Sequence, residues 1–211
     1  MVKCKRSYQI QKECIMRTIL IDSYNSQWKT EFQKIKNMLY PYISDIIVDI
    51  VHVGSTSVPG LPAKPIIDFI IIIDSYDEFP ELMKRLEPFG YQHDGDGGIP
   101  GRERIKGGLY DGFMDYHMYV CPKHSEELRR QILFRDYLTK YPETAKIYGD
   151  LKIRLSQQFP HDIDGYTDGK HEFVENILEE AQKENSIENL DPWEINADFL
   201  KNPKAKMKRL I

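Results

Sequence analysis

Two runs of apolar, β-branched residues lie close together in this sequence, and a short polar turn separates them. The first run covers residues 46–53 and the second covers residues 66–73, and turn-forming residues follow each run, as is typical of buried strands. The second run contains Asp68. A carboxylate in a buried strand costs several kcal/mol unless it is paired, protonated or bound to a metal. The sequence therefore predicts two neighbouring buried strands with a cation beside Asp68.

The turn between these strands has the composition of an anion-binding loop. Gly54 lets a ligand approach the backbone closely, and Ser55, Thr56 and Ser57 supply hydroxyl and amide groups. Asp68 would hold a divalent ion, Mg²⁺ or Mn²⁺, that bridges the phosphate oxygens. The segment therefore predicts a site for a phosphate group and a metal.

The spacing of these residues resembles the signature of the nucleotidyltransferase superfamily. That signature is a turn made of an apolar residue, Gly, and Gly or Ser, followed by a strand with Asp and a second acid two residues later. Val53-Gly54-Ser55 and, after twelve further residues, Asp68 match it. The second acid would fall at Ile70, which cannot ligate a metal. The resemblance thus implies a nucleotidyltransferase-like site with one of its two usual acids.

A longer stretch resembles the GrpB family. The family's sequence motif is matched by residues 52–60 and by the segment Lys64-Pro-Ile-Ile-Asp68. Further matches follow in the family's order: Tyr24 to Trp28, Gly90-Tyr91, Pro100-Gly101-Arg102, His117, Phe134 to Leu138, Leu151-Lys152, and Tyr166 with Lys170. Together they span about residues 17–182, which is long enough to be specific. The resemblance implies a nucleotidyltransferase-like fold rather than a particular reaction.

Composition limits the class of protein and its partners. The 211 residues predict one GrpB/nucleotidyltransferase-like domain over residues 1–182, followed by a linker and basic tail over residues 183–211. A net charge of −4 argues against binding of duplex DNA through the overall charge of the protein, although a local basic pocket is compatible with it. Three widely spaced cysteines, and no stretch of signal-peptide or membrane-span length, predict a cytoplasmic protein without a membrane partner.

Hydrophobic periodicity predicts an α/β (α+β) fold, a mixed sheet flanked by helices with a helical C-terminal third. Further strands are expected from Gly90-Tyr91 and over residues 102–106 and 113–120. Helices are expected over residues 25–40, 77–87, 124–141 and 146–159, and around Tyr166 and Lys170. The first helix is expected to stop near Pro41.

Several cations are candidates for phosphate binding. Arg102, Arg104 and Lys106 alternate along a short strand and would share one side of it, where they could hold a triphosphate. A solvated edge strand protected from aggregation would carry the same charges, and both interpretations stay open. Lys64 precedes Pro65 in a restrained loop beside the turn, so we expect it to contact phosphate.

The histidines near the turn and on the strand over 113–120 have different expected roles. His117 and Asp115 share the polar face of that strand, so either could supply the second metal ligand that Ile70 lacks. Alternatively, both face water or bond within the sheet. His52 lies on an apolar face, so we expect a hydrogen-bonded core histidine rather than a ligand.

Tyr166 and Lys170 are one helical turn apart, at i and i+4. The ring could stack on a nucleobase while the amine reaches a phosphate. Surface pairing of Lys170 with Asp168 or Glu172 is the alternative.

Together these residues predict a metal-dependent nucleotidyltransferase that transfers a nucleotidyl group from a nucleoside triphosphate to an acceptor. Asp68 is the expected first metal ligand, and His117 completes the metal shell or acts as acid and base. The alternative is a non-catalytic nucleotide-binding sensor or interaction module that retains the fold but lacks the second acid, because Ile70 occupies its position.

Overall fold

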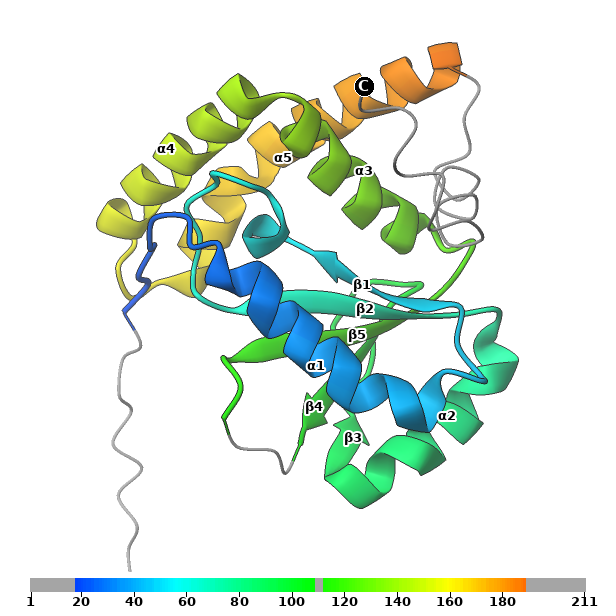
Figure 1. Cartoon of the computed structure of the whole chain (residues 1–211). Helices are drawn as coiled ribbons and strands as arrows, with labels where there is room; N and C mark the ends of the chain where they lie inside the picture. The colour runs from blue at the N-terminus through cyan, green and yellow to red at the C-terminus, as the bar shows by residue number, and fades with distance from the viewer. Residues whose placement is uncertain (1–17, 109–111, 189–211) are drawn as a thin grey trace, which may run out of the picture.

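A five-stranded mixed sheet lies at the centre of the protein (Figure 1). The computed structural model describes residues 18–108 and 112–188. The strands are β1 (Asp49–Val53), β2 (Ile67–Ile73), β3 (Tyr91–His93), β4 (Glu103–Gly107) and β5 (Tyr116–Pro122), in the spatial order β1-β2-β5-β4-β3. β2 and β5 run parallel, and the other neighbouring pairs are antiparallel. The sheet is therefore mixed, as the sequence predicted.

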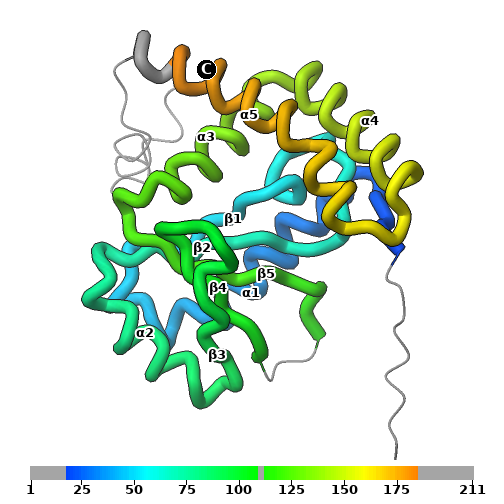
Figure 2. Tube along the Cα trace, turned by 180° about the vertical axis from the view of Figure 1, so that it is seen from behind, coloured from blue at the N-terminus to red at the C-terminus, as the bar shows by residue number. Residues whose placement is uncertain are grey.

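Helices cover both faces of this sheet (Figures 1 and 2). They are α1 (Gln27–Ile43), α2 (Phe79–Leu86), α3 (Glu126–Lys140), α4 (Pro142–Gln158) and α5 (Ile163–Glu188). α1 and α2 share a core with one face, and α3 packs against the other. α5 packs along both α3 and α4, so the last helices form an outer layer. This arrangement confirms the predicted sheet flanked by helices with a helical C-terminal third.

The alternation of side chains along β2 lets one strand contribute to both faces. Phe69 and Ile71 are fully buried in the core beneath α1 and α2, whereas Ile70 and Ile72 are fully buried against α3. Removing each such side chain from water contributes about 1.5–3 kcal/mol. Asp68 has the parity of Ile70, so its carboxylate lies on the side of α3.

The C-terminal end of α1 differs from the prediction. Pro41 lies inside the helix, which ends at Ile43 instead of stopping near the proline. A proline removes one backbone donor and crowds the carbonyl four residues earlier. Leu39 and Ile43 are 1% and 0% exposed, so packing of the last turn against the core outweighs this local cost.

Two strands begin three residues later than predicted. β1 begins at Asp49 and not at residue 46, and β5 begins at Tyr116, which leaves Asp115 outside the strand. In both cases the strand covers the part of the chain that has a residue of β2 to pair with. The apolar runs begin before the strands do, because half-buried residues of the preceding loops are also apolar. Backbone pairing, not apolar character, defines where a strand begins.

α5 continues past residue 182, where the sequence predicted a domain boundary, and ends at Glu188. Residues 183–188 of the predicted linker are therefore helical. The remainder of the predicted tail, residues 189–211, lies outside the described residues. Although α5 is 26 residues long, neither it nor any other helix in the described ranges is apolar enough to cross a membrane.

Candidate functional site

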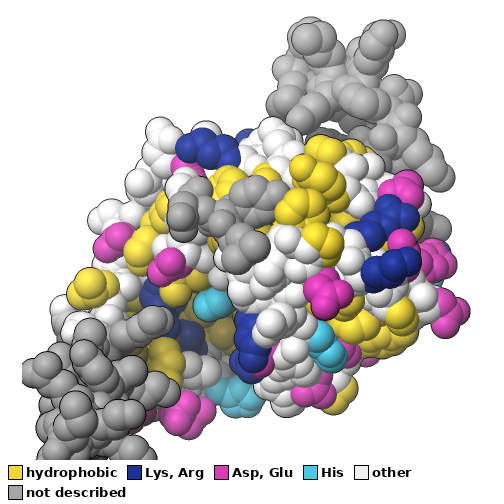
Figure 3. All heavy atoms as spheres, turned by 90° about the horizontal axis from the view of Figure 1, so that it is seen from below, with side chains coloured by type: hydrophobic (Ala, Val, Ile, Leu, Met, Phe, Trp, Pro, Cys, Tyr) yellow, Lys and Arg dark blue, Asp and Glu magenta, His cyan; other side chains and the backbone are white. Residues whose placement is uncertain are grey.

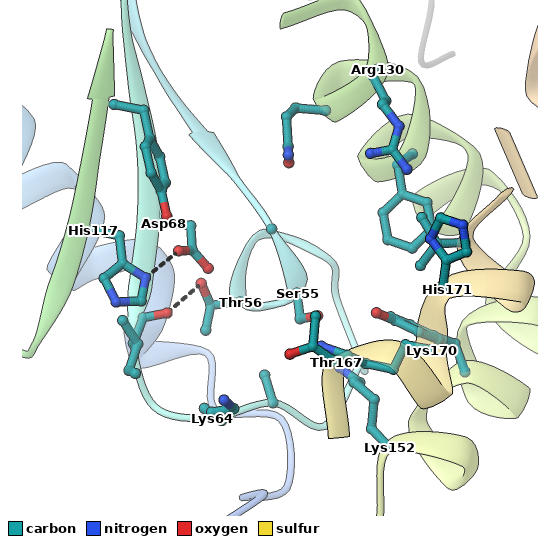
Figure 4. Close-up of a pocket in the computed structure, with 18 of the residues that line it drawn as sticks. Ser55, Thr56, Lys64, Asp68, His117, Arg130, Lys152, Thr167, Lys170 and His171 are labelled. Carbon is teal, nitrogen blue, oxygen red and sulfur yellow. Dashed lines mark hydrogen bonds and ion pairs between the residues drawn. The ribbon is translucent and has the colours of Figure 1, made fainter. Parts of the chain in front are cut away.

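A pocket of about 600 Å³ opens between the turn after β1, the sheet and helices α3, α4 and α5 (Figure 4). This volume is typical of small-molecule sites. Most of the predicted site residues line it: Gly54, Ser55, Thr56, Lys64, Asp68, Arg102, His117, Tyr166 and Lys170. Two do not, Arg104 and Asp115. The fold therefore gathers into one pocket most of the residues that the sequence singled out.

Asp68 and His117 lie side by side because β2 and β5 pair in parallel with these two residues in register. The His117 Nδ1 and Asp68 Oδ1 atoms are 2.8 Å apart (Figure 4). The two side chains are 52% and 30% exposed. Asp68 lies in a central strand, as predicted, but its carboxylate is only partly buried, because Asp68 is the second residue of β2 and lies where the sheet opens into the pocket.

Gly54 is required by the position of Asp68. Its φ is +67°, and a Cβ placed on it would lie 2.6 Å from Asp68 Oδ2. The close approach arises because Val53, the preceding residue, pairs with Asp68 across β1 and β2. A side chain at position 54 would therefore be strained and would displace the carboxylate. The predicted close approach at this glycine thus involves the chain's own acid.

The hydroxyl groups of the turn, a 3₁₀ turn over Ser55–Ser57, serve different purposes. The Thr56 hydroxyl donates to the Ile66 carbonyl at 3.3 Å. The His52 Nε2 atom lies 3.0 Å from the same hydroxyl, at Thr56 Oγ1. Ser57 bonds the backbone of the turn. Burial lowers the pKa of His52 to about 4, so His52 is the neutral, hydrogen-bonded histidine that was predicted. The hydroxyl of Ser55 is the one that Figure 4 shows facing the pocket.

Three lysines from different segments line the pocket, Lys64 from the loop before β2, Lys152 from α4 and Lys170 from α5. The Nζ atoms of Lys64 and Lys170 lie 4.8 and 4.3 Å from the centre of the Tyr166 ring. The Lys152 Nζ atom lies 4.8 Å from the centre of the Tyr148 ring. Tyr166 is 2% exposed, so its ring supports two ammonium groups and is not the free surface for stacking a base that the sequence suggested.

Burial weakens the hold of these lysines on their protons. It lowers the pKa of Lys152 to about 7, with a further contribution from the charge of Lys170. It also lowers the pKa of Lys170 to about 8, where Lys64 acts in the same direction and Asp68 opposes it. The pKa of Lys64 is lowered by burial as well. An anion placed between these groups would favour their charged forms.

The sequence analysis did not select Lys152 as a site residue. Lys152 lies on the same stripe of α4 as the buried residues Tyr148 and Leu155, and its Nζ donates to the Pro62 carbonyl. Gly149 makes this contact possible, because a Cβ there would lie 2.8 Å from the Pro62 ring. A lysine that interrupts an apolar helical stripe was the available signal.

The arginines of the pocket lie near acids, in contrast to the lysines. The Arg102 guanidinium lies 4.3 Å from the centre of the Tyr119 ring and 3.8 Å from Glu127. Its Nε atom is buried and has no hydrogen-bond partner among the described residues. Arg130, another lining residue that the sequence analysis missed, bonds Glu175.

Arg104 and Lys106 do not line the pocket, so the predicted triphosphate clamp of three cations is not formed. Both pair with Asp94, at 2.6 and 2.7 Å respectively. The reason is local, because Asp94 lies beside β4 and its carboxylate satisfies both charges. The edge-strand alternative was also wrong, since β4 lies between β5 and β3.

The pocket is positively charged although the chain has a net charge of −4. Among the described residues, five Lys or Arg side chains line it, and Asp68 is the single carboxylate. Figure 3 shows Lys, Arg and His side chains around a hollow on the lower face of the molecule. The charge of the pocket therefore favours an anionic ligand.

The donor set fits one divalent ion better than two. Asp68 and His117 present a carboxylate and an imidazole, and Mg²⁺ or Mn²⁺ takes its other ligands from substrate phosphates and water in such sites. Asp115 is exposed and outside the pocket, and Ile70 is 0% exposed. The described residues contain no group of three or more His, Cys, Asp or Glu side chains placed to hold a metal.

Comparison with known proteins places the chain in a family. The family model described as GrpB protein matches residues 18–180. The chain belongs to the GrpB family. A crystal structure of the conserved protein GrpB from Enterococcus faecalis superposes with a TM-score of 0.69 and 32% identity, covering 78% of this chain and 98% of that one. The predicted GrpB membership is confirmed, and so is the predicted mixed sheet flanked by helices.

Two GrpB relatives differ in how much of their own length the match covers. The Glutamate-rich protein GrpB of Alkalihalophilus pseudofirmus is 31% identical over 170 residues, which are 77% of this chain and 95% of the relative. The UPF0157 protein YqkA of Bacillus subtilis is 34% identical over 168 residues, covering 79% of this chain and 48% of YqkA. The chain therefore spans about half the length of YqkA.

Proposed function

We propose that this protein binds a nucleoside triphosphate in the pocket and transfers its nucleotidyl group to an acceptor hydroxyl, with one divalent ion, Mg²⁺ or Mn²⁺, held by Asp68. The observation that carries the proposal is the position of Asp68 and His117 in the same pocket as five Lys and Arg side chains. A strand-borne acid opposite a cationic wall is suited to hold a metal-bound polyphosphate.

The residues divide the chemistry between them. His117 donates from Nδ1 to Asp68, which leaves Nε2 with a lone pair that can accept the proton of the acceptor hydroxyl. The acceptor oxygen then bonds the α-phosphorus and pyrophosphate leaves. Lys64 and Arg102 neutralise the phosphate charge that grows during transfer. A bound divalent ion would supply Lewis-acid polarisation of the phosphate oxygens.

Product analysis with an α-labelled panel of nucleoside triphosphates and Mg²⁺ or Mn²⁺ tests the proposal. The wild-type chain is expected to release pyrophosphate, and Asp68→Asn is expected to lose turnover while keeping its fold. Asp74→Asn is the matched control, because Asp74 follows the other end of β2, is 60% exposed and pairs with Lys123. Wild-type turnover in Asp68→Asn would exclude a role for this carboxylate.

A second candidate is a nucleotide-binding module without catalysis, and the observation that favours it is Ile70. This residue stands where a second acid would ligate a second ion, and it is fully buried. The module predicts that a nucleotide raises the unfolding midpoint by mass action while no triphosphate yields a product. The same panel therefore separates the two candidates.

A further inference from the structure

Lys64, from the loop before β2, and Lys152 and Lys170, from α4 and α5, line the same pocket, and we call them the lysine cluster. In the view of Figure 4 the turn with Ser55 lies between Lys152 and Lys170 on one side and Asp68 on the other. The three amines come from a loop and two helices that are far apart in the sequence, so the fold itself assembles the cluster.

The cluster is left without acidic partners. Within the described parts of the chain, none of its three ammonium groups forms an ion pair, whereas Arg102 and Arg130 each have a glutamate nearby. Aromatic faces and the Pro62 carbonyl contact the amines instead. Three amines gathered in a partly dry pocket repel one another, and an anion between them would remove this repulsion.

We infer that the lysine cluster is a polyphosphate subsite that holds the terminal phosphates of a triphosphate without a metal ion. A second metal ion has no ligand at position 70, because Ile70 replaces the acid. The lysine cluster would neutralise the phosphate charge in place of that ion. The assignment of the anion to a nucleoside triphosphate rests on the proposed function, while the binding of a polyphosphate chain does not. Lysine suits this role, because its ammonium offers three rotatable donors to phosphate oxygens whose positions vary.

The charge of the cluster also sets the ligand class. A chain of three phosphates carries enough negative charge to meet three ammonium groups, and a single phosphate does not. We therefore expect inorganic tripolyphosphate to bind more tightly than pyrophosphate, and pyrophosphate more tightly than orthophosphate. The Ser55 and Thr167 side chains line the same pocket and can donate further hydrogen bonds to the phosphates.

Titration calorimetry of the full chain with inorganic tripolyphosphate, in EDTA at pH 7, tests the subsite. Wild type is expected to bind without metal, and Lys152→Met and Lys170→Met are each expected to weaken binding about tenfold or more. The matched controls are Lys146→Met on α4 and Lys183→Met on α5, whose lysines are exposed and pair with acids of their own helix. Both should bind within about twofold of wild type.

Two results would overturn the inference. One is an absence of tripolyphosphate binding to wild type in EDTA, and the other is wild-type affinity in both Lys152→Met and Lys170→Met. Asp68→Asn separates this test from that of the proposed function, because it should lose turnover and keep metal-free tripolyphosphate binding. Binding without any product from wild type would contradict the proposed function alone, and product without metal-free binding would contradict the subsite alone.

Discussion

Replacement of Lys152 by methionine tests what a buried ammonium group costs the folded protein. Lys152 is 2% exposed, and its pKa falls from 10.5 to about 7. The folded state therefore binds fewer protons than the unfolded state between pH 7 and 10.5, and stability rises with pH across this window. At about 1.36 kcal/mol per pKa unit, the cost is about 5 kcal/mol at pH 6 and about 2 kcal/mol at pH 9.

Methionine removes this cost but leaves the Pro62 carbonyl without the hydrogen bond from Nζ. An unpaired buried acceptor costs about 1–3 kcal/mol at either pH. The net expectation is that Lys152→Met stabilises the protein by about 3 kcal/mol at pH 6, which raises Tm by roughly 6–12 °C in a chain of this size. At pH 9 the two terms are of similar size, so Tm should change little.

Calorimetric unfolding at pH 6 and pH 9, in buffers free of phosphate, measures this difference. Lys146→Met on the same helix is the control, because Lys146 is exposed and pairs with Asp150 at 3.1 Å. Its effect on Tm should be small at both pH values. A Lys152→Met protein that is less stable than wild type at pH 6, or a Tm difference that does not vary with pH, would refute the reasoning.

Three other predictions concern the turn, the missing acid and pH. In urea unfolding, Gly54→Ala should destabilise the protein by about 2 kcal/mol and Gly60→Ala by about half that. Both glycines have positive φ, but only a Cβ at position 54 meets Asp68, so equal losses of stability would contradict this reasoning. Ile70→Asp should lower the free energy of unfolding by about 3–5 kcal/mol in the same assay, because it places an unpaired charge at a buried position. A variant as stable as wild type would show that solvent reaches position 70. Tripolyphosphate affinity should fall as pH rises from 7 to 9, because the lysines on α4 and α5 have pKa values of about 7 and 8 and lose charge; calorimetry showing a flat profile would contradict it.

Much of the site could be predicted because its chemistry is concentrated in one short segment. The turn from Gly54 and the strand with Asp68 pair directly, so their spacing in sequence already implied their contact. His117 was found because alternation along a strand limits which residues share a face, and the parallel register then placed it beside Asp68. Asp115 failed the same test, since it lies before the first paired residue of β5.

Partnering of the charged groups could not be predicted in the same way. Arg104 seemed equivalent to Arg102 by alternation, yet Asp94 lies close enough in space to pair with it. Lys152 interrupts an apolar stripe of α4, but this signal does not tell which turn of the helix lies beside Pro62 and the pocket. Asp94 and Arg104 are ten positions apart, and Pro62 and Lys152 are ninety apart, so the pattern along a single strand or helix contains no information about these contacts.

The apolar run over residues 66–73 was sufficient to specify a buried strand that contains one acid, and parity along the strand places that acid on the same face as Ile70. The family and the class of fold followed from that segment and the motifs around it. The lysine cluster was decided by the tertiary structure alone. Helices α4 and α5 and the loop at Lys64 have no local reason to share a ligand, and the packing of the helical layer against the sheet brings their amines together.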